Sequence, residues 1–335
     1  MARRMITGIL SAFGILLLIL DAKTALQGAS DAIELCLGSV IPSIFPFLVL
    51  SGLLTSVISS SQSKILKPMG RLLGIPKGSE GIFLTGILGG YPTGAQAVHR
   101  AWKQGTLNTE DARRMLGFCS NAGPSFIFGI LASIFPSIWM LWLLWGIHIL
   151  SAILTAVILP CVMPQGSLLL KGQTMTLSQS LKASVVTMGY ICGWIVLFRI
   201  VLAFCDRWVL WLLPSTLRVA VYGATELANG CCNLINISSV GQRFVVAGGM
   251  LAFGGICVAM QTLTITDGLG AGKYFPGKVL QMLISILLCC LAQMLLFAES
   301  DRWYISIQTL ILPLIMIVMI AFWQRKQKKG VAFLQ

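Results

Sequence analysis

Long apolar runs separated by short polar loops make up most of this chain. A run of about 20 apolar residues is long enough to cross the hydrocarbon core of a bilayer as a helix. The runs therefore predict an all-α polytopic membrane protein with about eight transmembrane helices. The predicted crossings are residues 5–21, 33–58, 115–135, 138–163, 183–205, 244–264, 279–298 and 303–323.

Two further apolar segments, residues 80–98 and 217–237, are shorter or interrupted by glycine, proline and amide residues. An unpaired peptide group in hydrocarbon costs several kcal/mol, so a broken backbone at membrane depth indicates a polar cavity inside the protein. We therefore expect both segments to form re-entrant hairpins. An alternative with ten crossings remains open, although it would move the basic residues between Arg100 and Arg114 to the outside.

Composition supports the membrane assignment and affects how the positive net charge is interpreted. Hydrophobic residues form 56% of the chain, charged residues 10%, and the mean hydropathy is +0.87. The net charge of +13 would suggest nucleic acid in a soluble protein, but here the basic residues lie in short loops between apolar runs. The positive-inside rule gives the better interpretation, with no nucleic-acid partner and with the lipid bilayer as the surroundings.

Basic residues are distributed unevenly between alternate loops. If the N-terminus is cytoplasmic, most of the 24 Lys and Arg residues fall inside, and the C-terminus is cytoplasmic as well. The first apolar run follows Arg3 and Arg4, and we favour a retained helix over a signal peptide because no convincing cleavage site follows Leu20 at once. The predicted internal basic residues include Lys64, Lys67, Arg71, Lys77, Arg100, Lys103, Arg113, Arg114, Lys273 and Lys278.

The order of crossings and hairpins occurs twice along the chain. Each unit has three crossings, so the second must be inverted relative to the first, as in transporters that place two gates around one site. The predicted divisions are an N-terminal helix at 1–30, a first repeat at 31–163, a linker at 164–182, a second repeat at 183–298, and a C-terminal helix with a basic tail at 299–335.

The breaks in the first unit carry its candidate binding groups. Pro92 and the neighbouring glycines predict a hairpin tip, and the helix that starts there would direct free N–H groups into the cavity. Simple proline kinks with glycine packing faces are the alternative. The candidate substrate-binding residues of this unit are Gly90, Pro92, Thr93, Gly94, Gln96, Asn121 and Ser125.

In the second unit, Glu226 is the one carboxylate predicted to lie at membrane depth, and Asn229 and Gln261 complete the candidate binding groups. An ionisable group inside a membrane is costly and suggests a function, such as proton coupling. The alternative is a structural carboxylate that pairs with Arg199 or caps the hairpin helix. Because Glu226 would repel an anionic solute unless it were neutral or paired, the charge of the solute stays open at this point.

Neither a metal site nor a cofactor is expected. The ten cysteines lie mostly in apolar runs without a Cys-x-x-Cys pair, and the two histidines, His99 and His148, have no ligand spacing between them. No nucleophile and base occur in a catalytic pattern, so we do not expect an enzyme.

Two sequence motifs resemble a known family. The runs Gly89–Ala95 and Cys119–Gly129, with Gly105–Leu107 between them, are similar to the YlbJ (SpoVV) family of sporulation integral membrane proteins, and Glu226–Gly230 with Phe253–Gly255 is similar to their second repeat. These are nucleoside-recognition or gate-domain membrane proteins. The resemblance implies a carrier for dipicolinic acid in the outer forespore membrane, with a fold related to nucleoside carriers.

The sequence thus favours a secondary transporter in a cell membrane, whose partner is a small anionic or heterocyclic solute. A nucleoside-type carrier and a non-transporting membrane partner of a sporulation complex are the alternatives. Homo-oligomers or assemblies with other sporulation membrane proteins are compatible with either function.

Overall fold

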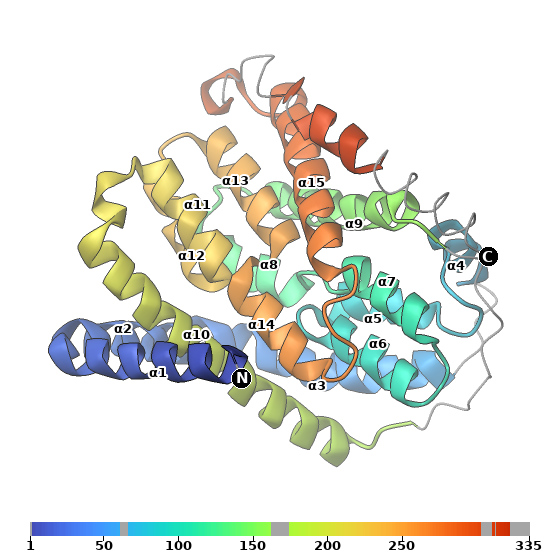
Figure 1. The fold of residues 1–335 in the computed structure, drawn as a ribbon. Helices are drawn as coiled ribbons and strands as arrows, with labels where there is room; N and C mark the ends of the chain where they lie inside the picture. The colour runs from blue at the N-terminus through green and yellow to red at the C-terminus, as the bar shows by residue number, and fades with distance from the viewer. Residues whose placement is uncertain (1, 61–65, 162–173, 303–309, 312, 322–335) are drawn as a thin grey trace.

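The computed structural model describes residues 1–335 except 1, 61–65, 162–173, 303–309, 312 and 322–335. All regular elements in the described part of the chain are helical (Figure 1). Most of the predicted linker at 164–182 and the basic tail therefore lie outside the described residues, as do residues 303–309, 312 and 322–323 of the predicted last crossing. The described residues of that crossing, 310–311 and 313–321, are helical.

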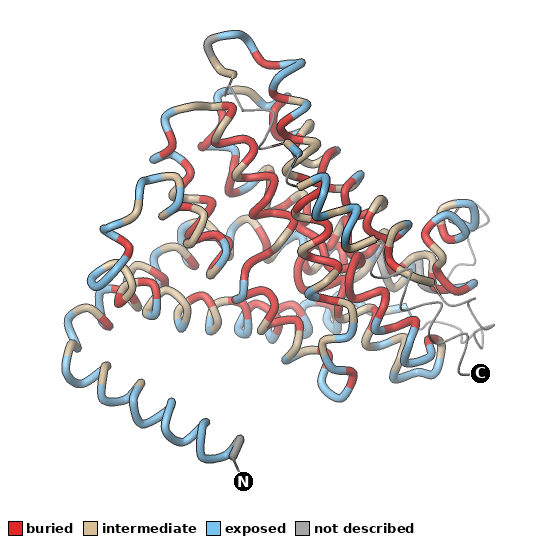
Figure 2. Tube along the Cα trace, turned by 45° about the horizontal axis from the view of Figure 1, so that its top comes forward, coloured by how far each residue is buried: buried red, intermediate tan, exposed pale blue. Residues whose placement is uncertain are grey.

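The chain begins with α1 (Ala2–Leu20), turns sharply, and continues through α2 (Ala22–Leu35) and α3 (Ile41–Ser60) in the opposite direction (Figure 1). A π-helical turn (Cys36–Val40) lies between α2 and α3. Asp21 starts α2 because its side chain accepts a hydrogen bond from the Thr24 backbone at 3.4 Å. Figure 2 shows α1 as an almost wholly exposed segment that projects from the body, and its exposed residues are mostly apolar. Such a surface suits contact with lipid.

The first half of the chain continues with a helical hairpin and a broken helix. Its elements are α4 (Lys67–Leu73), α5 (Gly81–Gly89), α6 (Thr93–Lys103), α7 (Thr109–Cys119), α8 (Pro124–Ile130), a 3-10 turn (Leu131–Ser133) and α9 (Ile138–Ile158).

The second half repeats this order. A long helix, α10 (Leu177–Trp208), packs along α2 and α3, and is followed by a helical pair, a broken helix and a final long helix. These elements are α11 (Ser215–Thr225), α12 (Leu227–Asn233), α13 (Val240–Phe253), α14 (Gly255–Ile265) and α15 (Tyr274–Leu296), with 3-10 turns at Leu210–Leu212, Leu234–Asn236 and Glu299–Asp301.

Six helical segments of the described chain are long and apolar enough to cross a membrane. They correspond to six of the eight predicted crossings, which confirms a polytopic helical membrane protein. The predicted crossing at 5–21 matches a shorter apolar helix, Arg4–Leu20. The six segments are Ala22–Leu54, Thr109–Ser133, Ile138–Ile158, Leu177–Trp208, Val240–Ile265 and Tyr274–Leu296.

The broken helices lie at the centre of the molecule. In Figure 1, α8, α13 and α14 lie between the α5–α6 pair on the right and the α11–α12 pair on the left. Contacts of α6 with α14 and of α12 with α8 agree with this arrangement. Segments Thr109–Ser133 and Val240–Ile265 are also more buried than the other four candidate spans. In their apolar 18-residue windows, 72% and 78% of the residues are buried. The broken helices therefore form the core around which a site can be built.

Candidate functional site

The break between α7 and α8 is an extended stretch whose backbone groups find hydrogen-bond partners within the protein. Asn121 donates to the carbonyl of Phe118 at 2.8 Å, and the Ala122 backbone N–H donates to Nε2 of His148 at 3.0 Å. Pro124 starts α8 and needs no N–H partner there. At this break, side chains therefore take the place of helical hydrogen-bond partners for the Phe118 carbonyl and the Ala122 N–H.

The equivalent break in the second half is formed by two consecutive glycines with positive φ, Gly254 and Gly255. Gly254 has φ +83° and ends α13, and α14 starts immediately after it. A Cβ atom added there would lie 3.1 Å from the Tyr91 ring, so the side chain of Tyr91 is packed directly on this break. Glycine is needed for both the conformation and the close approach.

The tip of the α5–α6 pair connects the two breaks. Gly90 has φ +73°, and a Cβ atom added there would lie 2.9 Å from the backbone nitrogen of Gly123. The next residue, Tyr91, donates its hydroxyl hydrogen to the carbonyl of Leu251, in the last turn of α13, at 3.1 Å. One tip residue therefore packs on the first break, and its neighbour bonds to the second half of the molecule.

The α11–α12 pair has its own tip at Glu226. The Glu226 carboxylate caps α12 by accepting from the backbone N–H groups of Ala228 at 3.0 Å and Asn229 at 2.7 Å, and also from the Asn229 side chain at 2.7 Å. This is the capping role that the sequence left open as an alternative. The carboxylate is nearly completely buried, and these hydrogen bonds with the helix N-terminus compensate for its charge.

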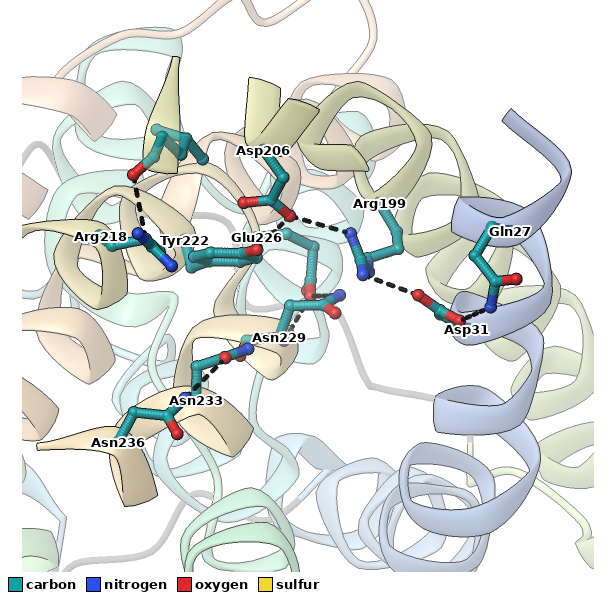
Figure 3. A network of polar contacts seen from close by, with 11 residues as sticks. Gln27, Asp31, Arg199, Asp206, Arg218, Tyr222, Glu226, Asn229, Asn233 and Asn236 are labelled. Atoms are coloured by element: carbon teal, nitrogen blue, oxygen red, sulfur yellow. Dashed lines mark hydrogen bonds and ion pairs between the residues drawn. The ribbon is translucent and has the colours of Figure 1, made fainter. Parts of the chain in front are cut away.

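Arg199 pairs with other carboxylates. Figure 3 shows Arg199 between Asp31, at 2.7 Å, and Asp206, at 3.7 Å, while Glu226 interacts with Asn229. Tyr222 donates a hydrogen bond to Asp206 and thereby connects α11 to this network. Among the described residues, no ion pair joins Arg199 to Glu226.

A small cavity lies where the tips and breaks meet. Its polar lining comes from Tyr91, Glu226 and Gln261, and the remaining lining is mainly apolar. The volume is about 30 Å³, which leaves room for about two water molecules. The structure therefore brings together Glu226 and Gln261, two of the candidate residues, with a tyrosine that the sequence had not selected.

A second cavity of about 30 Å³ lies between α3, α6 and α10. Thr93 and Gln96 line it from α6, and Gln96 donates to the hydroxyl of Thr187 on α10 at 3.0 Å. Ser180, Ser184 and Arg100 add further polar groups. Two more of the candidate residues thus line a polar space that is separate from the cavity beside Glu226.

The remaining candidate residues lie at helix starts or at close contacts between helices. Pro92 precedes the first turn of α6, Gly94 packs within that helix against α5 and α7, and Ser125 is buried in the first turn of α8. A Cβ atom on Gly94 would overlap the carbonyl oxygen of Cys119 and lie 2.8 Å from the Cα atom of Gly86. Gly94 therefore allows close contact between backbones, and it faces neither cavity.

A buried polar network lies behind Tyr91, and its central residue is Lys278. The Lys278 ammonium group donates to the Tyr91 hydroxyl at 3.0 Å and to Oε1 of Gln281 at 2.7 Å. Gln281 in turn donates to Oδ1 of Asn121 at 3.0 Å. The network thus joins α15, the first hairpin tip and the first break through side chains alone.

Sequence reasoning misplaced Lys278. It assigned this lysine to a cytoplasmic loop, whereas the structure places it in α15 with 0% of its surface exposed. A signal was present, because the buried face of α15 carries polar side chains at helical spacing within an apolar run. These buried polar residues are Lys278, Gln281, Ser285 and Gln293.

Arg114 was also expected in a basic loop and is buried. Its guanidinium donates to the carbonyls of Leu73, Gly74, Ala156 and Leu159, at distances from 2.6 to 3.4 Å. These contacts hold the ends of α4 and α9 against α7, so Arg114 has a structural role that loop composition did not reveal.

Comparison with known protein families, with characterised proteins and with solved structures found no match for this chain. The physical arrangement of the site therefore carries the functional argument.

Proposed function

We propose that this chain is a secondary transporter for a small anionic or heterocyclic solute. The YlbJ-like motifs make dipicolinic acid during spore formation the first solute to test, in the outer forespore membrane and with both chain termini cytoplasmic. A small solute and the surrounding lipid are the partners that this function requires.

The observation that supports transport best is the meeting of two helical tips and two helix breaks around a cavity with Tyr91, Glu226 and Gln261 in its lining. Tyr91 on the first tip bonds to Leu251 beside the second break, and Glu226 on the second tip lines the cavity next to Tyr91. Irregular backbone at membrane depth is tolerated where it lines a cavity, and carriers place their sites at such breaks.

The cavities are small in this conformation. Sites for small molecules usually occupy about 300–1,000 Å³, whereas the cavity beside Glu226 measures about 30 Å³. A solute therefore requires the tips to move apart from the breaks. Few polar contacts would have to break at the first tip, since Tyr91 makes its hydrogen bonds to Leu251 and Lys278 through one hydroxyl.

Uptake into liposomes tests this proposal. Purified protein is reconstituted, and accumulation of labelled dipicolinate, nucleosides and small carboxylates is compared with that in protein-free liposomes. We expect saturable uptake of at least one of these solutes. If correctly folded protein moves none of them, the proposal is wrong, and a non-transporting membrane partner becomes the better account.

A further inference from the structure

Lys278 is a buried lysine whose hydrogen-bond partners in the described structure are both neutral side chains. Its side-chain nitrogen donates to the Tyr91 hydroxyl and to the Gln281 amide oxygen, and it lies 5.1 Å from the centroid of the Tyr91 ring. No described carboxylate lies within ion-pair distance of it. The residue is 0% exposed.

Such an arrangement is costly for a purely structural lysine. Burying an ammonium group without a counter-ion carries a penalty of several kcal/mol, and neutral hydrogen-bond partners return only part of it. Ionisable residues at membrane depth are therefore usually paired or functional. A solute with a negative charge would supply the missing counter-ion.

The position of Tyr91 gives a route from the cavity to Lys278. The Tyr91 side chain lines the cavity beside Glu226, and its hydroxyl is the group that contacts Lys278. Tyr91 thus stands between the cavity and the ammonium group. If the first tip moves, the hydroxyl leaves both Leu251 and Lys278, and Lys278 loses a partner on the side of the cavity.

We propose that Lys278 binds a carboxylate of the transported solute, taking that oxygen in exchange for the Tyr91 hydroxyl when the first hairpin tip moves. This inference rests on the proposed transport function and adds the residue that holds a carboxylate of the solute. No covalent step is involved.

Glu226 already has its hydrogen-bond partners within α12. That carboxylate accepts three hydrogen bonds, all from groups of Ala228 and Asn229. Its charge is therefore directed toward the N-terminus of α12. Lys278 hydrogen-bonds to Tyr91 and Gln281 and shares no hydrogen-bond partner with Glu226 in the described structure, so an anion bound at Lys278 would not replace any contact of the Glu226 carboxylate.

The test compares two solutes of nearly the same shape. Dipicolinate carries two carboxylates, and its diamide carries none. Binding of each is measured by thermal stabilisation of the purified protein, and uptake of each is measured in liposomes. For wild type we expect stabilisation by the dianion in preference to the diamide. For Lys278→Gln we expect a loss of affinity for the dianion of about tenfold or more, because a charged hydrogen bond is removed, with little change for the diamide.

Two further variants separate binding from folding. Lys278→Arg keeps the positive charge and should retain the preference for the dianion, even if packing changes the affinity. Lys182→Gln removes an exposed lysine of α10 and should behave as wild type. A third variant, Tyr91→Phe, frees Lys278 from its hydroxyl partner and should raise the affinity for the dianion.

A merely structural Lys278 predicts a different result. The Lys278→Gln protein would then be less stable, but its ratio of dianion to diamide affinity would equal that of wild type, and this would overturn the inference. Wild-type protein that transports only neutral solutes would also overturn it while leaving the transport function intact. Failure of wild type to transport or bind any solute would overturn both.

Discussion

Three buried charged residues of the described chain, Arg114, Arg243 and Glu226, differ from Lys278 in the groups that they contact. Arg114 and Arg243 each direct several guanidinium donors at backbone carbonyls, Arg243 at those of Ile134 and Ile237. Glu226 likewise bonds to backbone N–H groups. Lys278 differs, since both of its hydrogen-bond partners are side chains, and these can move without unfolding a helix.

Substitutions at Glu226 separate its capping role from a transport role. Glu226→Ala removes the cap of α12, and we expect a loss in unfolding free energy of about 1–2 kcal/mol. Glu226→Gln retains an acceptor oxygen and should be destabilised less. The free energy of unfolding in detergent measures both effects, with Glu110→Ala as the control, because Glu110 is an exposed residue in the first turn of α7.

The sequence also predicts that Glu226→Gln loses the pH dependence of uptake, because the variant cannot titrate. Stable Glu226→Gln protein with unchanged uptake and unchanged pH dependence would show that Glu226 acts only as a cap.

At the scale of elements, each helical pair is held together by glycine contacts. Gly86 and Gly94 bring α5 and α6 together, and Gly223 and Gly230 bring α11 and α12 together, because a Cβ atom on the second glycine of each pair would lie too close to the Cα atom of the first. Glycine thus lets the backbones of each pair approach closely, as at other interfaces between membrane helices.

Gly94→Ala is therefore expected to disrupt folding, and not solute contact. The added methyl group overlaps the Cys119 carbonyl, which belongs to backbone and cannot rotate away. We expect a clear drop in the yield of folded protein and in its thermal stability. Gly146→Ala is the matched control, since nothing lies within 4 Å of a Cβ atom at that helical position. Equal stability of the two variants would contradict this packing role.

Helix existence and helix breaks could be predicted from the sequence to a large extent. Apolar runs indicated all six candidate spans of the described chain, and glycine, proline and asparagine marked the breaks after Cys119 and at Gly254. Lys278 was misplaced, because a basic residue at the edge of an apolar run also fits the loop pattern, and the helical spacing of Lys278, Gln281, Ser285 and Gln293 was not used to place it. Its burial depends on Tyr91 and Asn121, which are distant in sequence.

The whole molecule consists of two halves with the same order of elements. We predict that the two halves have opposite orientations in the membrane. If each half holds three crossings, the second is inverted. Residues 100–112 are then cytoplasmic and residues 299–302 external.

Cysteine labelling tests this topology. Gln104→Cys and Glu299→Cys occupy exposed positions near the two predicted faces, and each should react with an impermeant maleimide from one side only, Gln104→Cys from the cytoplasm and Glu299→Cys from outside. The parent protein, whose described cysteines are free, gives the background. Labelling of both positions from the same side would rule out the inverted arrangement.

Counterflow in liposomes tests the central claim most directly. Liposomes containing the protein are loaded with unlabelled dipicolinate, and the entry of labelled dipicolinate from outside is followed. A carrier that exposes one site alternately to the two sides predicts transient accumulation of label above its external concentration, and Lys278→Gln should abolish it. If the protein is a channel or does not transport, internal dipicolinate will not speed the entry of labelled dipicolinate. That result with folded wild-type protein would contradict the account.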